Sequence, residues 1–337
     1  MITDIRFYEK NHYLKFPKIV QIEITNRCPL KCPQCYKSPT PKQMSKKFFM
    51  DIVDECYEIG VGSIMLNGGE PILHSDVIEM IEYASQKNII THCFLSGFGI
   101  NPEIIKLLET TKVSISISLN GITKEINDLS RDGYEYAISA INLLKDSNIN
   151  WGINWVARHD NIMDFNNLVD YAVSKKAKFI NIIANKINGR ELLSPMDYHD
   201  FILLKDFIEK NRRKIIIRVE SCFSIMNVFM KTKRPALFKG CMAGIVACFI
   251  DVDGNYWPCS HLCYPERFNS IADYWEKSIY LKKLRAIDLK TSIYCRECNQ
   301  NDDCRFCLAV SHRTSKNFNI GFANCPVAEK PFLTGEL

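Results

Sequence analysis

The sequence of 337 residues has no long apolar run, no strong charge imbalance and no spaced cluster of histidines. Its longest uncharged apolar stretch, residues 240–250, is much shorter than the ~18 residues that cross a bilayer, so we expect no membrane partner. No apolar segment follows the polar start of the chain, so we expect no secretory signal peptide. The net charge of +5 is too small to indicate a nucleic-acid partner. These features predict a globular protein of the reducing cytoplasm.

Two stretches are nevertheless basic. Residues 1–50 and residues 205–240 each contain ten lysines and arginines against three acidic residues. Solvated surface is the simpler interpretation of such runs. The alternative is a local positive field that attracts an acidic partner peptide.

Cysteine is the residue type that the sequence has in excess. There are 15 cysteines, and ten of them lie between Cys222 and Cys325. In a reducing compartment, cysteines at short spacings bind metal more often than they pair with each other. The cysteine pattern is therefore the main indication of function.

The first half of the chain alternates between short apolar runs and amphipathic stretches. The apolar runs lie at residues 19–25, 63–67, 89–95, 113–119, 151–157 and 179–184, and each predicts a strand. Helical periodicity follows them at residues 48–59, 77–84, 101–110, 134–145, 161–174 and 195–211. Six strand–helix units imply a parallel sheet. The predicted fold class is α/β, a partial (β/α)6 barrel with reactive groups at the carboxyl ends of its strands.

From about residue 218 the periodicity weakens and cysteines dominate. Such a region builds little apolar core, so we expect metal to contribute its folding energy. The predicted organisation is an N-terminal extension over residues 1–17, a partial barrel over 18–215 and a small cysteine-rich domain over 216–337.

Directly after the first predicted strand, Cys28, Cys32 and Cys35 follow one another with the spacing Cys-x3-Cys-x2-Cys. Thiolates select zinc or iron–sulfur clusters. A structural zinc site normally has four protein ligands, whereas a cubane held by three thiolates leaves one iron open. The alternative interpretation is that these cysteines are three of the four ligands of a zinc knuckle.

This loop resembles the signature of the radical S-adenosylmethionine (SAM) superfamily, including the aromatic Tyr36 after the third cysteine. The resemblance implies that Cys28, Cys32 and Cys35 hold a 4Fe-4S cluster whose fourth iron binds the amino and carboxylate groups of SAM. It also implies that an electron, from a reductant such as flavodoxin or ferredoxin, cleaves SAM to methionine and a 5′-deoxyadenosyl radical. That radical then abstracts hydrogen from the substrate.

Further motifs carry the same resemblance. Gly68, Gly69 and Glu70 stand after the second predicted strand and resemble the family's Gly-Gly-Glu-Pro motif. Glycines let the backbone approach a ligand closely. A carboxylate can accept a hydrogen bond from an ammonium group. The fourth strand ends in a segment similar to the family's Ser-Leu-Asp-Gly, with Asn120 in place of the acid. By resemblance, the SAM-contacting residues are Tyr36, Gly68, Gly69, Glu70, Ser96, Ser118, Arg131 and Asn154; for Ser96 and Asn154, a turn cap and a polar strand residue are the alternatives.

The second cysteine group resembles the SPASM extension of radical SAM enzymes that modify peptides, in which seven cysteines house two auxiliary iron–sulfur clusters. The spacing departs from that pattern in one place, because two residues instead of three separate the fifth and sixth cysteines. The resemblance implies an outer cluster on Cys295, Cys298, Cys304 and Cys325. It implies an inner cluster on Cys241, Cys259 and Cys307.

The fourth ligand of the inner cluster stays open between Cys222, Cys248, Cys263 and a free coordination site. A zinc ribbon is the alternative for residues 295–307. Cys56 lies on the apolar face of a predicted helix and Cys93 inside a predicted strand. Both are interpreted as small core residues, with a hydrogen-atom donor as the alternative.

The function expected from these patterns is a radical SAM/SPASM enzyme that modifies a ribosomally synthesised precursor peptide, through a crosslink, a thioether or a related bond. The first alternative keeps the chemistry but changes the substrate to a sulfatase or to a small alcohol or sugar. The second alternative is a zinc-stabilised binding module without catalysis. The catalytic base is not assigned.

Overall fold

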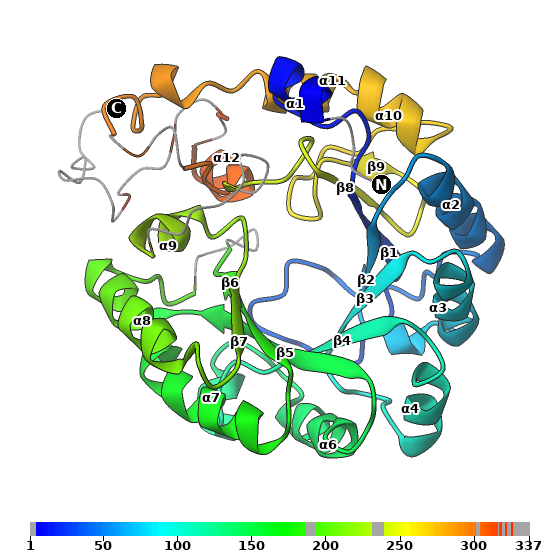
Figure 1. Ribbon diagram of the computed structural model, residues 1–337, viewed down its shortest axis with the longest axis vertical. Helices are drawn as coiled ribbons and strands as arrows, with labels where there is room; N and C mark the ends of the chain where they lie inside the picture. The colour runs from blue at the N-terminus through cyan, green and yellow to red at the C-terminus, as the bar shows by residue number, and fades with distance from the viewer. Residues whose placement is uncertain are drawn as a thin grey trace.

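A computed structural model describes residues 5–186, 193–230, 239–298, 300, 304–315, 317–318, 321 and 325. Within these residues, a nine-stranded sheet has the order β7-β6-β5-β4-β3-β2-β1-β8-β9. All neighbouring strands are parallel except β8 and β9. The sheet curves into an open barrel, with its helices on the outside (Figure 1).

The six predicted strand–helix units are confirmed. Strands β1 to β6 cover Ile19–Thr25, Ser63–Gly68, Ile90–Leu95, Val113–Ser118, Asn150–Ala157 and Phe179–Ala184. The outer helices are α2 (Lys46–Glu58), α3 (Val77–Gln86), α4 (Pro102–Leu108), α6 (Tyr134–Leu144), α7 (Phe165–Ser174) and α8 (Tyr198–Asn211). Short helices lie between or before these elements at α5 (Lys124–Asp128), Pro71–Leu73 and His159–Asp164.

Capping side chains set several helix starts. The Ser45 side chain accepts from the Phe48 amide, and the Asn101 side chain accepts from the Ile104 amide. Each bond satisfies an amide that has no partner within the first turn of a helix. Helix α8 begins at Tyr198, later than the predicted residue 195, because Asp197 occupies the cap position.

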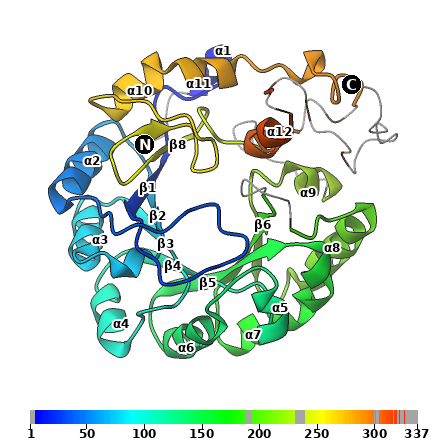
Figure 2. The same cartoon turned by 180° about the vertical axis from the view of Figure 1, so that it is seen from behind.

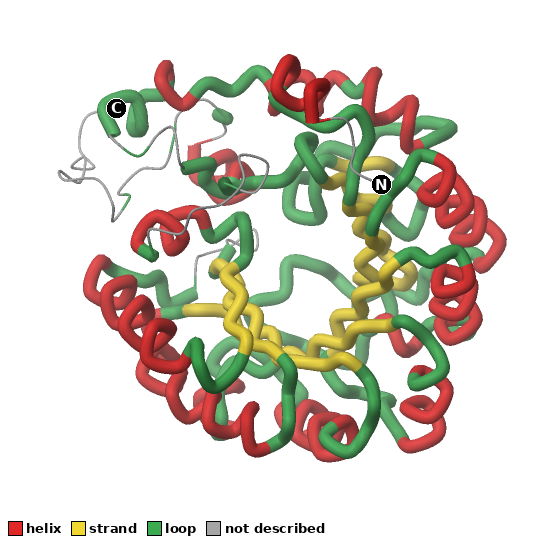
Figure 3. The backbone as a smooth tube through the Cα atoms, in the orientation of Figure 1, coloured by secondary structure: helices red, strands yellow, loops and turns green. Residues whose placement is uncertain are grey.

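The barrel core lies between the sheet and the outer helices (Figure 3). Cys56 on α2 and Cys93 on β3 are both buried in this core, which confirms their interpretation as small apolar residues. Trp151 and Trp155 of β5 are also buried there. The inner face of the sheet carries both polar side chains, such as Asn154 and Asn181, and apolar ones, such as Met65 and Phe94.

The sheet continues beyond residue 215, where we placed the end of the barrel. Strand β7 (Ile216–Val219) pairs with β6, and β8 (Ala247–Ile250) pairs with β1 at the other edge. The antiparallel β9 (Tyr256–Trp257) completes that edge. Three strands of the cysteine-rich half therefore extend the barrel sheet, and the boundary between the two domains stays a prediction.

The remaining helices lie along the side of the barrel occupied by the second half of the chain (Figures 1 and 2). They are α1 (Ile5–Asn11), α9 (Ser224–Phe229), α10 (Ile271–Lys277), α11 (Ile279–Arg285), the short helix Leu289–Thr291 and α12 (Leu308–Ser315). The buried Leu14 accepts a hydrogen bond of 2.8 Å from the Trp275 indole. The N-terminal segment thus packs on the second half of the chain. None of the helices in the described ranges is long and apolar enough to cross a membrane.

Candidate active site and cysteine clusters

The loop that follows β1 carries Cys28, Cys32 and Cys35 and lies across the open centre of the barrel (Figure 2). Cys28 and Cys32 are half-buried and Cys35 is exposed. Burial raises the pKa of the Cys28 thiol, and negative charge on Glu70, Cys32 and Cys35 raises it further. The structure therefore brings the three cysteines together with the Glu70 carboxyl group.

Gly68 and Gly69 hold this loop against the end of β2. A Cβ atom on Gly68 would lie 2.3 Å from the Thr25 carbonyl oxygen, and one on Gly69 would lie 2.4 Å from the Arg27 carbonyl oxygen. Two main-chain hydrogen bonds of 2.8 Å, from Gly69 to Thr25 and from Glu70 to Arg27, join the segments. The missing side chains therefore let the cysteine loop approach β2, and contact of these glycines with a ligand stays a prediction.

Replacing Gly69 by alanine is expected to displace the cysteine loop, because the new methyl group would also lie 2.7 Å from Cys28 Cβ. Overpacking of this kind costs roughly 1–3 kcal/mol of stability. Urea unfolding and the iron content of anoxically reconstituted protein measure the two effects. Gly62→Ala is the matched control, since its nearest contact would be 3.7 Å from the Lys18 carbonyl. Normal stability and iron content in Gly69→Ala would contradict this role.

Glu70 is 1% exposed and is held by Ser96 at the end of β3. Glu70 Oε2 accepts hydrogen bonds from the Ser96 amide at 2.9 Å and from the Ser96 hydroxyl. Glu70 Oε1 is buried and has no hydrogen-bond partner. Burial raises the Glu70 pKa to about 7, against the opposing effect of the Ser96 bonds. An unpaired buried carboxylate oxygen is costly, so this atom is suited to a cationic ligand.

Arg131 lies beside the cysteine loop. Burial raises the pKa of the Cys32 thiol, and the positive charge of Arg131 opposes that rise. Arg131 charge also lowers the pKa of Glu70. The Arg131 guanidinium therefore acts on both the cysteine loop and the Glu70 carboxyl group, and a guanidinium can bind a carboxylate.

Asn120, which replaces the family's acid, joins four segments near this position. Its side-chain amide donates to Gln34 at 2.9 Å and to Ser130 at 2.8 Å, while its side-chain oxygen accepts from the Val156 amide at 3.0 Å. A carboxylate at this position offers no donor to Gln34 or Ser130. The amide therefore links the cysteine loop to the ends of β4 and β5.

The other candidates for SAM contact are Tyr36, Asn154 and Ser118. The Tyr36 ring packs on His261, with ring centroids 4.1 Å apart, and His261 donates its main-chain amide to Cys259 Sγ at 3.4 Å. Asn154 accepts a hydrogen bond of 2.7 Å from Asn181 inside the barrel. Ser118 is the last residue of β4. Tyr36 thus links the first cysteine loop to the second cysteine group.

Four cysteines of the second half gather at the barrel centre. The Cys222 thiol is hydrogen-bonded to both Cys241 and Cys307, and these bonds lower the pKa of the Cys241 thiol to about 6 and also lower that of Cys307. Burial raises the pKa of the Cys259 thiol, and the negative charges of Cys241 and Cys307 raise it further. Of the three candidates for a fourth inner ligand, only Cys222 makes these contacts: Cys248 is buried beside Cys56 and Cys263 is exposed.

The four cysteines expected to form the outer set also lie together. Burial raises the pKa of the Cys304 thiol to about 12, and the charges of Cys325, Cys295 and Cys298 contribute to the rise. Gly321 passes so close to this group that a Cβ there would lie 2.8 Å from Cys295 Sγ.

The spacing of the sulfur atoms bears on whether a cysteine group could hold one metal ion. Among the described residues, no three cysteine sulfurs all lie within 4.8 Å of one another. Tetrahedral zinc with bonds of about 2.3 Å brings its sulfur ligands to roughly 3.8 Å apart. The described sulfurs therefore do not form a complete site for one zinc ion.

A cavity of about 440 Å³ is lined by Tyr36 of the first cysteine loop and by the inner cysteines. Its wall is formed by the inner faces of β1 to β7 and by the inner cysteines. Among its lining residues are Tyr36, Asn154, Lys186, Arg218, Cys222 and Cys259. A concave cavity of this size is suited to a ligand or a substrate.

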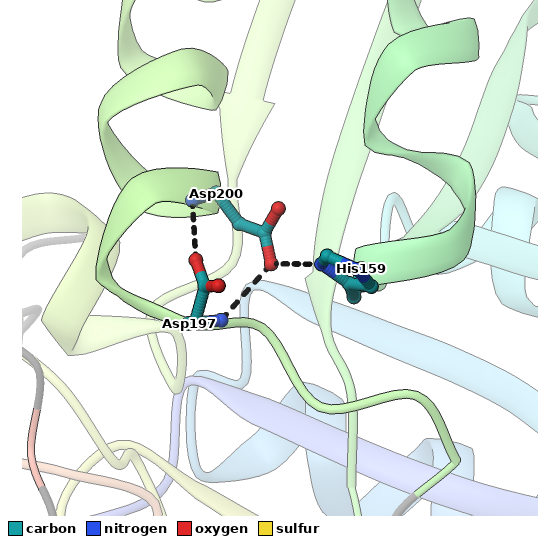
Figure 4. A group of neighbouring side chains, drawn as sticks. All are labelled: His159, Asp197 and Asp200. Atoms are coloured by element: carbon teal, nitrogen blue, oxygen red, sulfur yellow. Dashed lines mark hydrogen bonds and ion pairs between the residues drawn. The ribbon is translucent and has the colours of Figure 1, made fainter.

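His159, Asp197 and Asp200 form a separate polar group on the outside of the barrel (Figure 4). His159 Nδ1 lies 2.8 Å from Asp200 Oδ2, and each aspartate accepts from the main-chain amide of the other at 2.9 Å. These bonds are the capping box of α8 and its contact with the preceding short helix. The arrangement is explained by helix capping.

The sequence patterns did not identify Lys186, Arg218 and Glu220 as residues of the cavity lining. They follow or belong to β6 and β7, and the predicted barrel ended before β7. The four-residue run Ile216–Val219 was the available signal, but its charged Arg218 interrupts the apolar pattern that marks a strand.

Residues 22–172 match the radical SAM superfamily. The chain contains a radical SAM domain. This domain includes the three cysteines of the first loop, Glu70 and Arg131, so the sequence match and the geometry refer to the same residues.

Two relatives extend beyond the radical SAM domain. The AdoMet-dependent heme synthase of Nitratidesulfovibrio vulgaris is 25% identical over 331 residues, covering 88% of this chain and 89% of that protein. Mycofactocin maturase MftC of Mycobacterium ulcerans is 26% identical over 324 residues, covering 90% and 86%. The fold is similar to Streptococcus suis SuiB bound to precursor peptide SuiA, with a TM-score of 0.79, 16% identity and coverage of 94% and 77%.

Proposed function

We propose that this protein is a radical SAM/SPASM enzyme that modifies a ribosomally synthesised precursor peptide. The observation that carries the proposal is the cavity, whose lining brings Tyr36 of the first cysteine loop together with the inner cysteines Cys222, Cys241, Cys259 and Cys307. Similarity to a mycofactocin maturase and to the fold of a peptide-bound SuiB supports a peptide substrate.

Cys28, Cys32 and Cys35 would hold the 4Fe-4S cluster to which SAM binds. When bound, the cluster and SAM supply a 5′-deoxyadenosyl radical that removes a hydrogen atom from the substrate. Glu70 Oε1 would accept from the SAM ammonium group, and Arg131 would bind the SAM carboxylate. Ser96 fixes the Glu70 carboxyl group in that orientation. Tyr36, Gly68, Gly69, Ser118 and Asn154 remain proposed contacts of the same cofactor.

Replacing Glu70 by glutamine is expected to weaken SAM binding by roughly 10-fold or more, because a buried charged hydrogen bond is lost. Cluster iron should be unchanged, since Glu70 is not a ligand. Equilibrium dialysis of SAM with the reconstituted protein measures the affinity. Glu79→Gln, on the exposed side of α3, is the control. Unchanged SAM affinity in Glu70→Gln would disprove the assignment.

The second half would carry two auxiliary iron–sulfur clusters in a SPASM domain over residues 216–337. The inner cluster would take Cys222 as its fourth ligand, together with Cys241, Cys259 and Cys307. The outer cluster would use Cys295, Cys298, Cys304 and Cys325. Clusters of this kind persist in a reducing compartment, so we place the protein in the cytoplasm with flavodoxin or ferredoxin as its reductant.

The test of peptide modification is co-expression with short peptides encoded beside the gene, followed by mass spectrometry. A mass change that depends on intact Cys28, Cys32 and Cys35 is the expected result. Unchanged peptide mass with an enzyme that is active in SAM cleavage would reject the peptide substrate. Colourless protein containing zinc and no acid-labile sulfide, after anoxic purification, would instead support the zinc-stabilised binding module.

Similarity to an AdoMet-dependent heme synthase favours a second candidate, in which the substrate is a small molecule. The same SAM site and cavity would serve it. Turnover of an iron tetrapyrrole without any added peptide would establish this function. A loss of two hydrogens from a sulfatase would indicate the remaining alternative.

A further inference from the structure

The cavity has three charged side chains in its lining that are neither cysteine nor histidine: Lys186, Arg218 and Glu220. Two of them neutralise each other. Lys186 Nζ lies 2.8 Å from both carboxylate oxygens of Glu220, and Glu220 Oε2 also accepts from the Ala184 amide at 3.1 Å. Lys186 is thereby paired, and the Glu220 carboxylate is already occupied.

Arg218 has no such partner. It is exposed to the cavity, and within the described part of the chain its guanidinium makes neither a hydrogen bond nor an ion pair. The guanidinium lies over the Phe179 ring, with its carbon 4.3 Å from the ring centroid. A guanidinium stacked on a ring keeps the N–H groups at its edge available for hydrogen bonding.

The stacked position of Arg218 is built into the sheet. A Cβ on Gly152 would lie 2.4 Å from the Phe179 ring, so the ring fits only because β5 has a glycine there. Asn154, Asn181 and Arg218 are register partners across β5, β6 and β7. The Asn181 side chain donates a hydrogen bond of 2.7 Å to the Asn154 side chain. These three register partners thus place two linked amide side chains beside the Arg218 position.

We propose that Arg218 binds a carboxylate of the substrate, the side chain of an aspartate or glutamate in the peptide, and so determines which residue enters the cavity. The proposal rests on the proposed function. The guanidinium has a planar pair of donors suited to a carboxylate, and the nearby acid, Glu220, is occupied by Lys186. Apart from the cysteine thiols, Arg218 therefore carries the one charge in this lining that has no charged partner among the described residues, and a positive charge matches an anionic group.

The test uses cluster-loaded, SAM-bound enzyme and two probes, N-acetyl-glutamate N-methylamide and its neutral glutamine counterpart. Competition binding under anoxic conditions should show the wild type preferring the glutamate probe by about 10-fold. Arg218→Gln should remove that preference, and Arg218→Lys should retain part of it. Arg212→Gln makes the same change at the end of α8, outside the cavity lining, and should keep the full preference.

Equal binding of both probes to the wild type would overturn the proposal, as would an undiminished preference in Arg218→Gln. Because binding needs no turnover, this result is separate from the proposed function. A glutamate preference that depends on Arg218, together with no modified peptide, would retain the carboxylate site and reject the peptide substrate. With a modified peptide in hand, replacing its acidic residues one at a time by their amides should abolish modification at one position only.

Discussion

Cys32→Ala is expected to reduce 5′-deoxyadenosine formation from SAM to the level of a control without protein. Two thiolates cannot hold the cubane that three would, and SAM then has no iron to bind. The measurement is chromatographic detection of 5′-deoxyadenosine after anoxic reconstitution and reduction with dithionite. The outer and inner clusters should remain, so part of the iron content should persist.

The loop itself should survive this substitution. Main-chain hydrogen bonds from Asn26 to Lys42 and from Gln34 to Ser130 hold it independently of the Cys32 sulfur. Cys263→Ala is the matched control, because Cys263 is exposed and belongs to no cysteine group. Retained SAM cleavage in Cys32→Ala, or its loss in Cys263→Ala, would contradict the assignment of the cluster.

Cys222→Ala is expected to separate SAM cleavage from substrate modification. The inner cluster would lose the thiol that contacts both Cys241 and Cys307, and its electron paramagnetic resonance signal should change. SAM cleavage should continue, because Cys222 is not one of the three cysteines of the first loop and its thiol contacts Cys241 and Cys307 instead. Peptide modification should fall by at least about 10-fold, as expected when an auxiliary centre is disturbed.

The control for Cys222→Ala is again Cys263→Ala, which tests one of the two rejected ligands. Cys248→Ser tests the other. An unchanged resonance signal and normal peptide modification in Cys222→Ala would show that the inner cluster does not use this thiol. If the resonance signal changed only in Cys248→Ser, Cys248 on β8 would be the fourth ligand.

Much of the barrel could be predicted because its signals are local. Strands β1 and β6 have the predicted bounds, and the other four differ by one residue at an end. The parallel strands are buried on one face and covered by helices, so each leaves a short apolar run in the sequence. The spacing of Cys28, Cys32 and Cys35 is local in the same way, since three ligands from one loop need no other part of the chain.

The long-range features could not be predicted in this way. Pairing of β8 with β1 joins segments more than 200 positions apart, and nothing in the run at residues 247–250 specifies its neighbour. The contact of Cys222 with Cys241 and Cys307 likewise depends on where the chain returns to the barrel. Spacing alone left Cys222, Cys248 and Cys263 equivalent, whereas burial and contacts distinguish them.

The sequence by itself determined the kind of chemistry, because residue types and short spacings specify which thiolates, carboxylates and glycines are available. Only the tertiary structure decided how they are used: it placed Gly69 beneath Cys28, left one oxygen of Glu70 unpaired and stacked Arg218 on Phe179. The physical reason is that packing and hydrogen-bond partners arise between distant segments. Those contacts determine which polar atoms are already satisfied and which remain available for a ligand.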